Sequence, residues 1–343
     1  MVLKIMQQLV ERDQNVIDEV ERTKWKRTLQ TLIKDWRLYV LLIPMLLFLI
    51  LFKYFPIGGL LTGFKWGSDT SMYNGEWAGL YWAQYIFSGS MSGRFWLAFR
   101  NTFVNSMYGL ILGFPIPIFL ALLFSEIKCT GYRSFLQVAS YLPHFVSTVV
   151  VTTIIGLWCE GTSLLNANGG VVYMLCKALH LTSSGDTLLA QPKFFRPIYQ
   201  ISGIWEGAGY GSIVYFAAIL AISPTSYEAA RIDGASKLQQ IRYITFPGMA
   251  PTLTIMLIMR IGHILNVGYE KVILLIGDKP SAYETGDVVS SFVYRMSGKD
   301  PNYQGSIIAQ AGIVADLFNS ILAMVLVLGA NAISRRVSTT SLF

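Results

Sequence analysis

Long runs of hydrophobic residues, separated by polar connectors, dominate the pattern of this 343-residue chain. Each run contains about 20 mostly apolar residues, the length that an α-helix needs to cross the hydrocarbon core of a bilayer. We therefore predict an all-α polytopic membrane protein with six transmembrane helices. The predicted spans are Tyr39 to Leu60, Thr102 to Phe124, Leu136 to Trp158, Pro197 to Ile222, Pro251 to Leu275 and Ile307 to Ile333.

Composition agrees with this class, since 53% of the residues are hydrophobic and only 14% are charged. Lys and Arg predict the orientation, because the cytoplasmic connectors of membrane proteins carry an excess of them. Fifteen of the 27 lie in the N-terminal leader, the second and fourth connectors and the C-terminal tail, whereas the longer alternate segments hold eleven. Both termini of this multi-pass protein are therefore predicted to be cytoplasmic, and the net charge of +7 needs no nucleic-acid partner.

The pattern divides the chain into a cytoplasmic leader (residues 1–38), a transmembrane domain (39–333) with a long cytoplasmic loop (223–250), and a short cytoplasmic tail (334–343). The first hydrophobic run follows a charged leader and is long enough to stay in the bilayer, so we predict a retained helix rather than a cleaved signal peptide. Apolar residues of the leader recur at roughly helical spacing. This fits either an amphipathic helix on the inner membrane face or on a partner, or a solvated tail.

Candidate chemistry is sparse. Cys159 and Cys176 fall in one predicted external segment, where the pattern fits either a disulfide or two unlinked apolar side chains. The three histidines are scattered, so no metal site is predicted. The one Gly-Lys pair, Gly298 and Lys299, lacks the spacing of a phosphate-binding loop. Uphill transport would therefore need an ion gradient or another subunit.

The loop between the fourth and fifth spans predicts a helix, a break and a second helix. Thr225 with Glu228 has the spacing of a capping box, and Gly234 can adopt the left-handed conformation that ends a helix. Ser236 with Gln239 repeats the capping pattern. Two prolines, Pro247 and Pro251, are predicted to stop the second helix before the fifth span.

This loop resembles the EAA loop of permease subunits in binding-protein-dependent ABC importers. The resemblance is carried by Glu228-Ala229-Ala230, by Gly234, and by Ile244-Thr245-Phe246-Pro247, although the family usually has Leu at the position of Phe246. The Asp233-Gly234-Ala235 continuation, Asn266-Val267-Gly268-Tyr269-Glu270 and the Asn331 to Arg336 ending look like the sugar-importing branch, especially its polysaccharide-type permeases.

The resemblance implies a type I ABC importer permease fold in a bacterial plasma membrane, and a subunit that imports an oligo- or polysaccharide by alternating access. The implied partners are a second permease in a heterodimer, two ATPase subunits that bind the ATP and Mg, and an extracellular solute-binding protein. The chain itself would be no enzyme and would hold no cofactor or metal. Its implied ATPase-coupling residues are Glu228, Ala229, Ala230, Asp233 and Gly234.

A substrate pathway is predicted where polar residues lie at helical spacing in the fourth and fifth spans, because such groups are expensive in lipid and face protein or water. The candidates are Glu206, Gly207, Tyr210, Arg260, His263, Asn266, Tyr269 and Glu270, of which Gly207, Tyr210, Asn266 and Tyr269 are carried over from the resemblance. Tyr210 and Asn266 fit cavity lining and interhelical bonding equally.

Three alternatives stay open along this pathway. The ladder of Gly203, Gly207 and Gly211 favours close helix packing over a ligand site. Glu206 is predicted to pair with Arg260, or Asp316 competes for the same guanidinium. Arg260 and His263 would suit acidic sugars, but not if Glu206 neutralises them.

Two other classes of protein fit the pattern less well. A self-sufficient ion-coupled secondary transporter would show inverted repeats, and no repeat of the loop is visible. An intramembrane enzyme would need a nucleophile and base at matched depths, and the polar residues are too scattered. The outer segments Phe55 to Arg100 and Trp158 to Arg196 fit either a seat for the binding protein or aromatic belts at the lipid headgroups.

Overall fold

A computed structural model describes residues 31, 33–66, 75–162, 167–183, 185–298 and 308–337. Within these ranges the secondary structure is helical, apart from one isolated antiparallel bridge between Lys65 and Trp77. The predicted all-α class is therefore confirmed for the described part of the chain. The possible amphipathic helix in residues 1–20 lies outside it.

The helical elements follow one another with short connections. In chain order they are α2 (Trp36–Leu49), η1 (Ile50–Tyr54), η2 (Phe55–Phe64), α3 (Tyr81–Phe87), α4 (Ser92–Ile111), α5 (Pro115–Glu126), α6 (Thr130–Tyr141), η3 (Leu142–Phe145), α7 (Thr148–Trp158), α8 (Val171–Ala178), η4 (Leu188–Ala190), α9 (Pro192–Leu220), α10 (Pro224–Ile232), α11 (Lys237–Gln240), η5 (Ile241–Thr245), α12 (Phe246–Gly262), α13 (Tyr269–Ile276), η6 (Pro280–Ala282), α14 (Tyr283–Gly286), α15 (Val289–Met296) and α16 (Ala309–Val337).

Contacts divide the chain between Leu60 and Leu61 into two units. The first unit contains α2, in which no side chain is buried. The candidate span that begins there, Trp36–Phe64, has a mean hydropathy of 2.4 in its most apolar window. A strongly apolar helix without buried side chains suits a lipid or protein environment.

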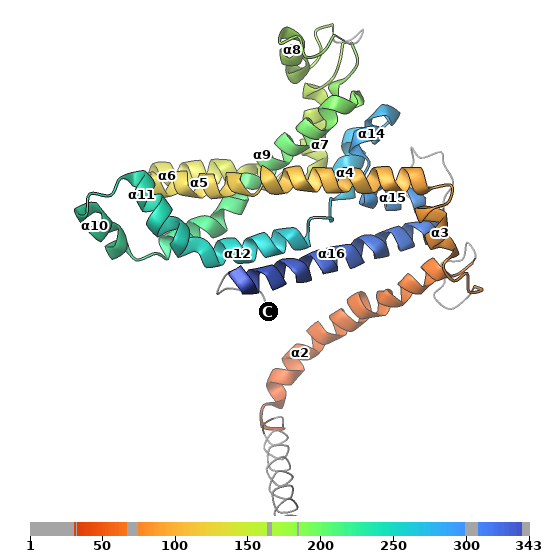
Figure 1. The fold of residues 1–343 in the computed structure, drawn as a ribbon, viewed down its shortest axis with the longest axis horizontal. Coiled ribbons are helices and arrows are strands. Elements are labelled where there is room, and N and C mark those ends of the chain that lie inside the picture. Colours follow the sequence, from red (N-terminus) through yellow and green to blue (C-terminus); the bar gives the residue numbers. More distant parts are fainter. Residues whose placement is uncertain are drawn as a thin grey trace, which may run out of the picture. The chain divides into compact units, whose positions relative to one another are not determined.

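In the second unit, the long helices pack side by side around several small clusters of buried apolar residues. Helix α5 packs on α9, and α12 packs on both α9 and α16. One cluster, around Tyr215 and Met249, joins α5, α9 and α12. Helices α10 and α11 lie at one end of these long helices, and α3 and α15 lie at the other (Figure 1).

Four helical stretches are long and apolar enough to cross a membrane, or up to six if each of two bent pairs is one span. One bent pair, Thr130–Phe145 with Thr148–Trp158, contains the predicted third span and turns by 94°. The third span is therefore a broken pair of helices. Pro143 sits in a short 3₁₀ turn, and the Ser147 hydroxyl then caps a new helix by accepting from the Val149 amide at 3.3 Å.

The fifth span also differs from the prediction. A helical stretch runs from Lys237 to Gly262, and the chain is irregular from His263 to Gly268 before α13 begins. Neither Pro247 nor Pro251 stops the helix. Pro247 occupies the first turn of α12, directly after the π-helical turn η5, and Pro251 lies inside α12. We attribute this to the wider turn, which relieves the clash between a proline ring and the preceding carbonyl.

The irregular segment after α12 is anchored by side chains from three other helices. Ser106 of α4 donates to the Ile264 carbonyl, Asn319 of α16 donates to the Leu265 carbonyl at 3.1 Å, and Ser290 of α15 donates to the Val267 carbonyl. Non-helical backbone within a membrane must find such partners, because lipid offers none. The break after α12 is thus stabilised by specific hydrogen bonds from neighbouring helices.

The outer aromatic residues do not form one class. Trp82 is packed against a buried cluster and donates to the Lys65 carbonyl at 2.9 Å, whereas Trp77 is 64% exposed. The cysteines are unlinked: Cys159 is buried directly after α7, and Cys176 is half-buried in α8. Of the two alternatives for this pair, the structure has separate apolar side chains.

Candidate substrate pocket and coupling loop

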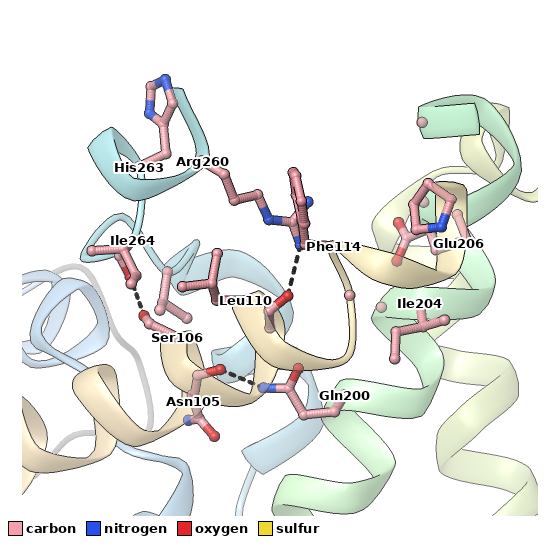
Figure 2. Close-up of a pocket in the computed structure, with 18 of the residues that line it drawn as sticks. Asn105, Ser106, Leu110, Phe114, Gln200, Ile204, Glu206, Arg260, His263 and Ile264 are labelled. Carbon is pink, nitrogen blue, oxygen red and sulfur yellow. Dashed lines mark hydrogen bonds between the residues drawn. The ribbon is translucent and has the colours of Figure 1, made fainter. Parts of the chain in front are cut away.

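A pocket of about 640 Å³ lies among α4, the α4–α5 junction, α9, α12 and the irregular segment after α12. Figure 2 shows Arg260 extending from α12 toward Phe114, with Glu206 of α9 on the other side of that ring. The polar and charged residues that line it are Asn105, Ser106, Tyr199, Gln200, Glu206, Tyr215, Arg260, His263, Asn266 and Lys271. Polar groups from helices distant in sequence therefore converge on one space.

Glu206 forms an ion pair with Lys271, at 2.8 Å between the carboxylate Oε2 and the ammonium Nζ. Their side chains are 20% and 12% exposed. The prediction that Glu206 pairs with Arg260 was wrong, and within the described residues Asp316 makes no ion pair with Arg260 either. The break after α12 decides the partner, because α13 starts in a new direction and brings Lys271 into the pocket.

Arg260 instead hydrogen-bonds the backbone. Its Nη2 donates to the Gly109 carbonyl at 3.1 Å, where α4 is about to end (Figure 2). Gly113 leaves the room for this contact, since a Cβ there would lie 2.8 Å from Nη2. Helix α4 ends at Ile111, so Gly109 lies in its last turn, where carbonyls need donors from elsewhere.

A further hydrogen bond joins α4 to α9 at the wall of the pocket. Gln200 donates from Nε2 to the Asn105 carbonyl at 2.8 Å (Figure 2). Above it, Lys271 Nζ lies 5.7 Å from the centre of the Tyr199 ring. The wall therefore offers an aromatic face, an amide and an ion pair close together.

Five of the eight predicted pathway residues line this pocket, namely Glu206, Gly207, Arg260, His263 and Asn266. The other three lie outside it. Tyr210 stacks on His144 at 4.0 Å between ring centres, and Tyr269 stacks on Tyr294 at 4.8 Å. Glu270 is exposed next to Tyr269. The helical face that linked Arg260 to Glu270 does not exist, because the helix ends at Gly262.

The glycine ladder of α9 faces the pocket rather than a tightly packed helix. A Cβ added to Gly207 would meet nothing within 4 Å, and one added to Gly203 would come only within 3.8 Å of Lys271 Nζ. Close packing is instead made by Gly209, where a Cβ would lie 2.0 Å from the Ser140 carbonyl oxygen of α6. The favoured packing role for the ladder was therefore wrong at Gly203 and Gly207.

Sequence reasoning missed Asn105, Gln200 and Lys271. A signal was present for Gln200, which precedes Gly203 and Gly207 by three and seven residues and so shares their helical face. Asn101 and Asn105 likewise sit four residues apart at the start of an apolar run. Lys271 gave no such signal, because its position depends on the broken helix.

The coupling loop, residues 223–250, has the predicted helix–break–helix form. Helix α10 ends in a Schellman arrangement, with the Ala235 amide bonded to the Ala230 carbonyl at 2.8 Å and the Gly234 amide bonded to the Arg231 carbonyl at 3.1 Å. Gly234 has φ +76°, as predicted. The Ser236–Gln239 capping box is confirmed.

The other predicted capping box was wrong. Ser223, not Thr225, caps α10, and its hydroxyl lies 2.7 Å from the Thr225 hydroxyl instead of bonding an amide. The residue Pro224 then occupies the first turn, where its missing amide hydrogen costs nothing. The helix thus starts two residues earlier than the box required.

Helix α10 has no buried residue, and Ile232 at its end is 86% exposed. Of the implied coupling residues, Glu228, Ala229, Asp233 and Gly234 are exposed and Ala230 is half-buried. This helix therefore presents a free surface with little side-chain bulk.

Two contacts brace the loop internally, and one ties it to α5. The Tyr227 hydroxyl lies 3.0 Å from the Thr245 hydroxyl, and Gln240 donates to the Ala235 carbonyl at 2.9 Å. Lys237 pairs with Glu126 at the end of α5 at 2.6 Å. Tyr227 thus joins α10 to the turn that precedes α12, and Lys237 joins the loop to α5.

A polar pocket between membrane-spanning helices, next to an exposed helix bonded to one of them, is the arrangement expected of a transport subunit. The comparisons with known proteins agree. Residues 87–339 match the model of the binding-protein-dependent transport system inner membrane component family. The chain belongs to this family of ABC importer permeases.

Several relatives and solved structures are named for the transport of saccharides. Protein LplB of Bacillus subtilis is 32% identical over 97% of this chain and 98% of its own length. The polygalacturonan/rhamnogalacturonan transport system permease protein YteP of the same organism is 31% identical over 92% and 93%. A bacterial ABC transporter involved in the import of the acidic polysaccharide alginate is 37% identical, with a TM-score of 0.78, and covers 91% of this chain and 100% of that one.

These comparisons confirm the type I importer permease fold and the multi-pass membrane location. They do not favour the alternative of a self-sufficient ion-coupled transporter, since the family is that of subunits which work with binding proteins.

Proposed function

We propose that this chain is one of two permease subunits of an ATP-driven importer that carries an oligo- or polysaccharide across the bacterial plasma membrane. One observation carries the proposal: the helices that line the pocket continue directly into the exposed coupling helix. Helix α9 lines the pocket and leads into α10, and the helical stretch that starts at Lys237 reaches the pocket at Arg260.

Two features support a carbohydrate as the cargo. The relatives named above include transporters of polygalacturonan, rhamnogalacturonan and alginate. The pocket wall also combines the Tyr199 ring with amide and charged groups, which is the mixture that stacks on sugar rings and hydrogen-bonds hydroxyls.

The proposed assembly contains a second permease, two ATPase subunits and an extracellular solute-binding protein. An alginate transporter 37% identical to this chain has been solved with an alginate pentasaccharide-bound periplasmic protein, which supports the last of these partners. We expect ATP and Mg to bind to the ATPase subunits, and this chain to hold no cofactor or metal of its own.

The termini and the coupling loop are proposed to face the cytoplasm. The Lys and Arg distribution supports this, and α10 and α11 lie at the opposite end of the long helices from α3 and α15 (Figure 1). In this orientation Glu228, Ala229, Ala230, Asp233 and Gly234 would enter a groove on the ATPase, and closure of the ATPase pair would shift α9 and α12 together.

Replacing Glu228 with Ala, or Gly234 with Pro, tests this proposal in the reconstituted complex. We expect ATP-dependent uptake to be lost while membrane insertion stays normal, because Glu228 is exposed and Gly234 has the left-handed φ that proline cannot adopt. The matched control is Asp278→Ala, whose side chain is 89% exposed outside the loop and the pocket. Unchanged uptake in both loop variants would refute the coupling role.

A second experiment separates this function from the alternative class. The purified chain alone in liposomes, given a proton or sodium gradient, is expected to move no saccharide. Concentrative uptake without an ATPase would instead identify a secondary transporter.

A further inference from the structure

Arg260 is an uncompensated cation in the pocket. A guanidinium has five N–H donors, and the structure gives Arg260 one hydrogen bond, to the Gly109 carbonyl. No carboxylate among the described residues forms an ion pair with it. The contact with Gly109 fixes one edge of the planar group beside the pocket and leaves its other donors available.

The nearest candidate counter-ion in the pocket is already engaged. Glu206 is held by Lys271 at 2.8 Å, and both side chains are at least four-fifths covered. Figure 2 shows Glu206 and Arg260 on opposite sides of Phe114, and His263 diverging from Arg260 along α12. Within the pocket, the pair of Glu206 and Lys271 is neutral, so the charge of Arg260 remains.

Arg260 is an exposed residue that lines the pocket, so a transported molecule can reach its guanidinium. The guanidinium fork matches a carboxylate, which it binds through two parallel hydrogen bonds. A neutral sugar hydroxyl offers no such match. The unfilled donors therefore indicate an anionic group on the transported molecule.

We propose that Arg260 is the specificity-determining residue of this pocket and binds the carboxylate of uronic-acid units, so that acidic saccharides are favoured over neutral ones. Glu206 and Lys271 form an internally neutral pair beside Tyr199, where the uncharged face of a neighbouring sugar packs. This assignment rests on the proposed carbohydrate import function. It further specifies that the substrate is anionic and that Arg260 binds its charged group.

Equilibrium binding to the purified complete importer, without nucleotide and without the binding protein, tests the assignment directly. The probes are trigalacturonate and the same trisaccharide after carboxyl reduction, which removes the charge and keeps the ring stereochemistry. We expect the intact protein to prefer trigalacturonate. Arg260→Gln should weaken trigalacturonate binding about tenfold to hundredfold, the effect of one charge-assisted bidentate contact, and leave the reduced trisaccharide unchanged.

Two variants serve as controls. Arg260→Lys keeps the charge but loses the fork, so it should retain only part of the preference. Lys279→Gln removes the same charge from a residue that pairs with Asp278 outside the pocket, and should bind both saccharides as the intact protein does.

The outcomes separate the two proposals. If the intact importer binds both trisaccharides equally, or if Arg260→Gln lowers the affinity for both by the same factor, the selectivity assignment is overturned and carbohydrate import stands. If the intact importer binds neither trisaccharide and its purified form retains anionic lipid that Arg260→Gln loses, the cation serves a lipid and the selectivity assignment is overturned. Carbohydrate import is then decided separately, by ATP-dependent uptake of other saccharides in the reconstituted complex.

Discussion

The contacts within the coupling loop and the contacts within the pocket differ in the sequence separation of the residues that they join. In the loop, the bonded residues are close in sequence: Tyr227 and Thr245 are 18 residues apart, and Ser236 and Gln239 are three apart. In the pocket, Arg260 bonds to a residue 151 positions away, and Ser106 to one 158 positions away. The loop contacts are therefore mostly local, apart from the pair of Lys237 and Glu126, whereas the pocket exists only through the arrangement of several helices.

This difference suits the proposed transport cycle. The coupling loop must keep its own shape while it moves, and its helix caps and short-range hydrogen bonds provide that stiffness. A site that must alternate between two accessible states needs walls from several helices that can shift relative to one another. The separation of the two kinds of contact gives each region the property it needs.

The largest effect is expected from crowding the helices behind the pocket. Gly209→Ala would place a Cβ 2.0 Å from the Ser140 carbonyl oxygen, so α6 and α9 must separate, at a cost of about 1–3 kcal/mol. The matched variant Gly207→Ala has nothing within 4 Å of the new Cβ and should keep its stability. Thermal unfolding of both variants in detergent measures the difference. Equal melting temperatures would show that the close approach at Gly209 is not required.

A smaller effect is expected from loosening the loop. Tyr227→Phe removes the hydroxyl that bonds Thr245 and should cost about 0.5–1.5 kcal/mol locally, without unfolding the protein. Because this bond joins α10 to the base of α12, we expect fewer saccharides imported per ATP hydrolysed, with ATP hydrolysis itself retained. Tyr243→Phe is the control, since that ring is 67% exposed. An unchanged ratio of uptake to hydrolysis would show that the contact between Tyr227 and Thr245 has no role in coupling.

The smallest effect concerns the segment that contains Cys159 and Cys176, where tertiary packing buries one cysteine apart from the other. Burial raises the pKa of Cys159 to about 12, so this thiol stays protonated at pH 8 and should react with maleimide more than tenfold more slowly than the exposed Cys129. Intact mass before and after reduction should be identical. A gain of two mass units on reduction would instead establish a disulfide between Cys159 and Cys176.

Much of the loop could be predicted from its residues alone. Gly234, Ser236 and Gln239 act on backbone groups within five residues, so their spacing is sufficient information. The prediction from the prolines failed because a π-helical turn of five residues accommodates Pro247. No residue type in Ile241–Thr245 indicates that turn from the sequence.

The sequence by itself determined the membrane class, the approximate spans and the helix–break–helix shape of the coupling loop, because each follows from composition or from neighbours along the chain. Only the tertiary structure decided that α12 ends at Gly262, that Glu206 pairs with Lys271, and that Arg260 turns to the Gly109 carbonyl. Those outcomes depend on which donors three other helices bring to the broken backbone, and helical periodicity within one segment carries no information about them.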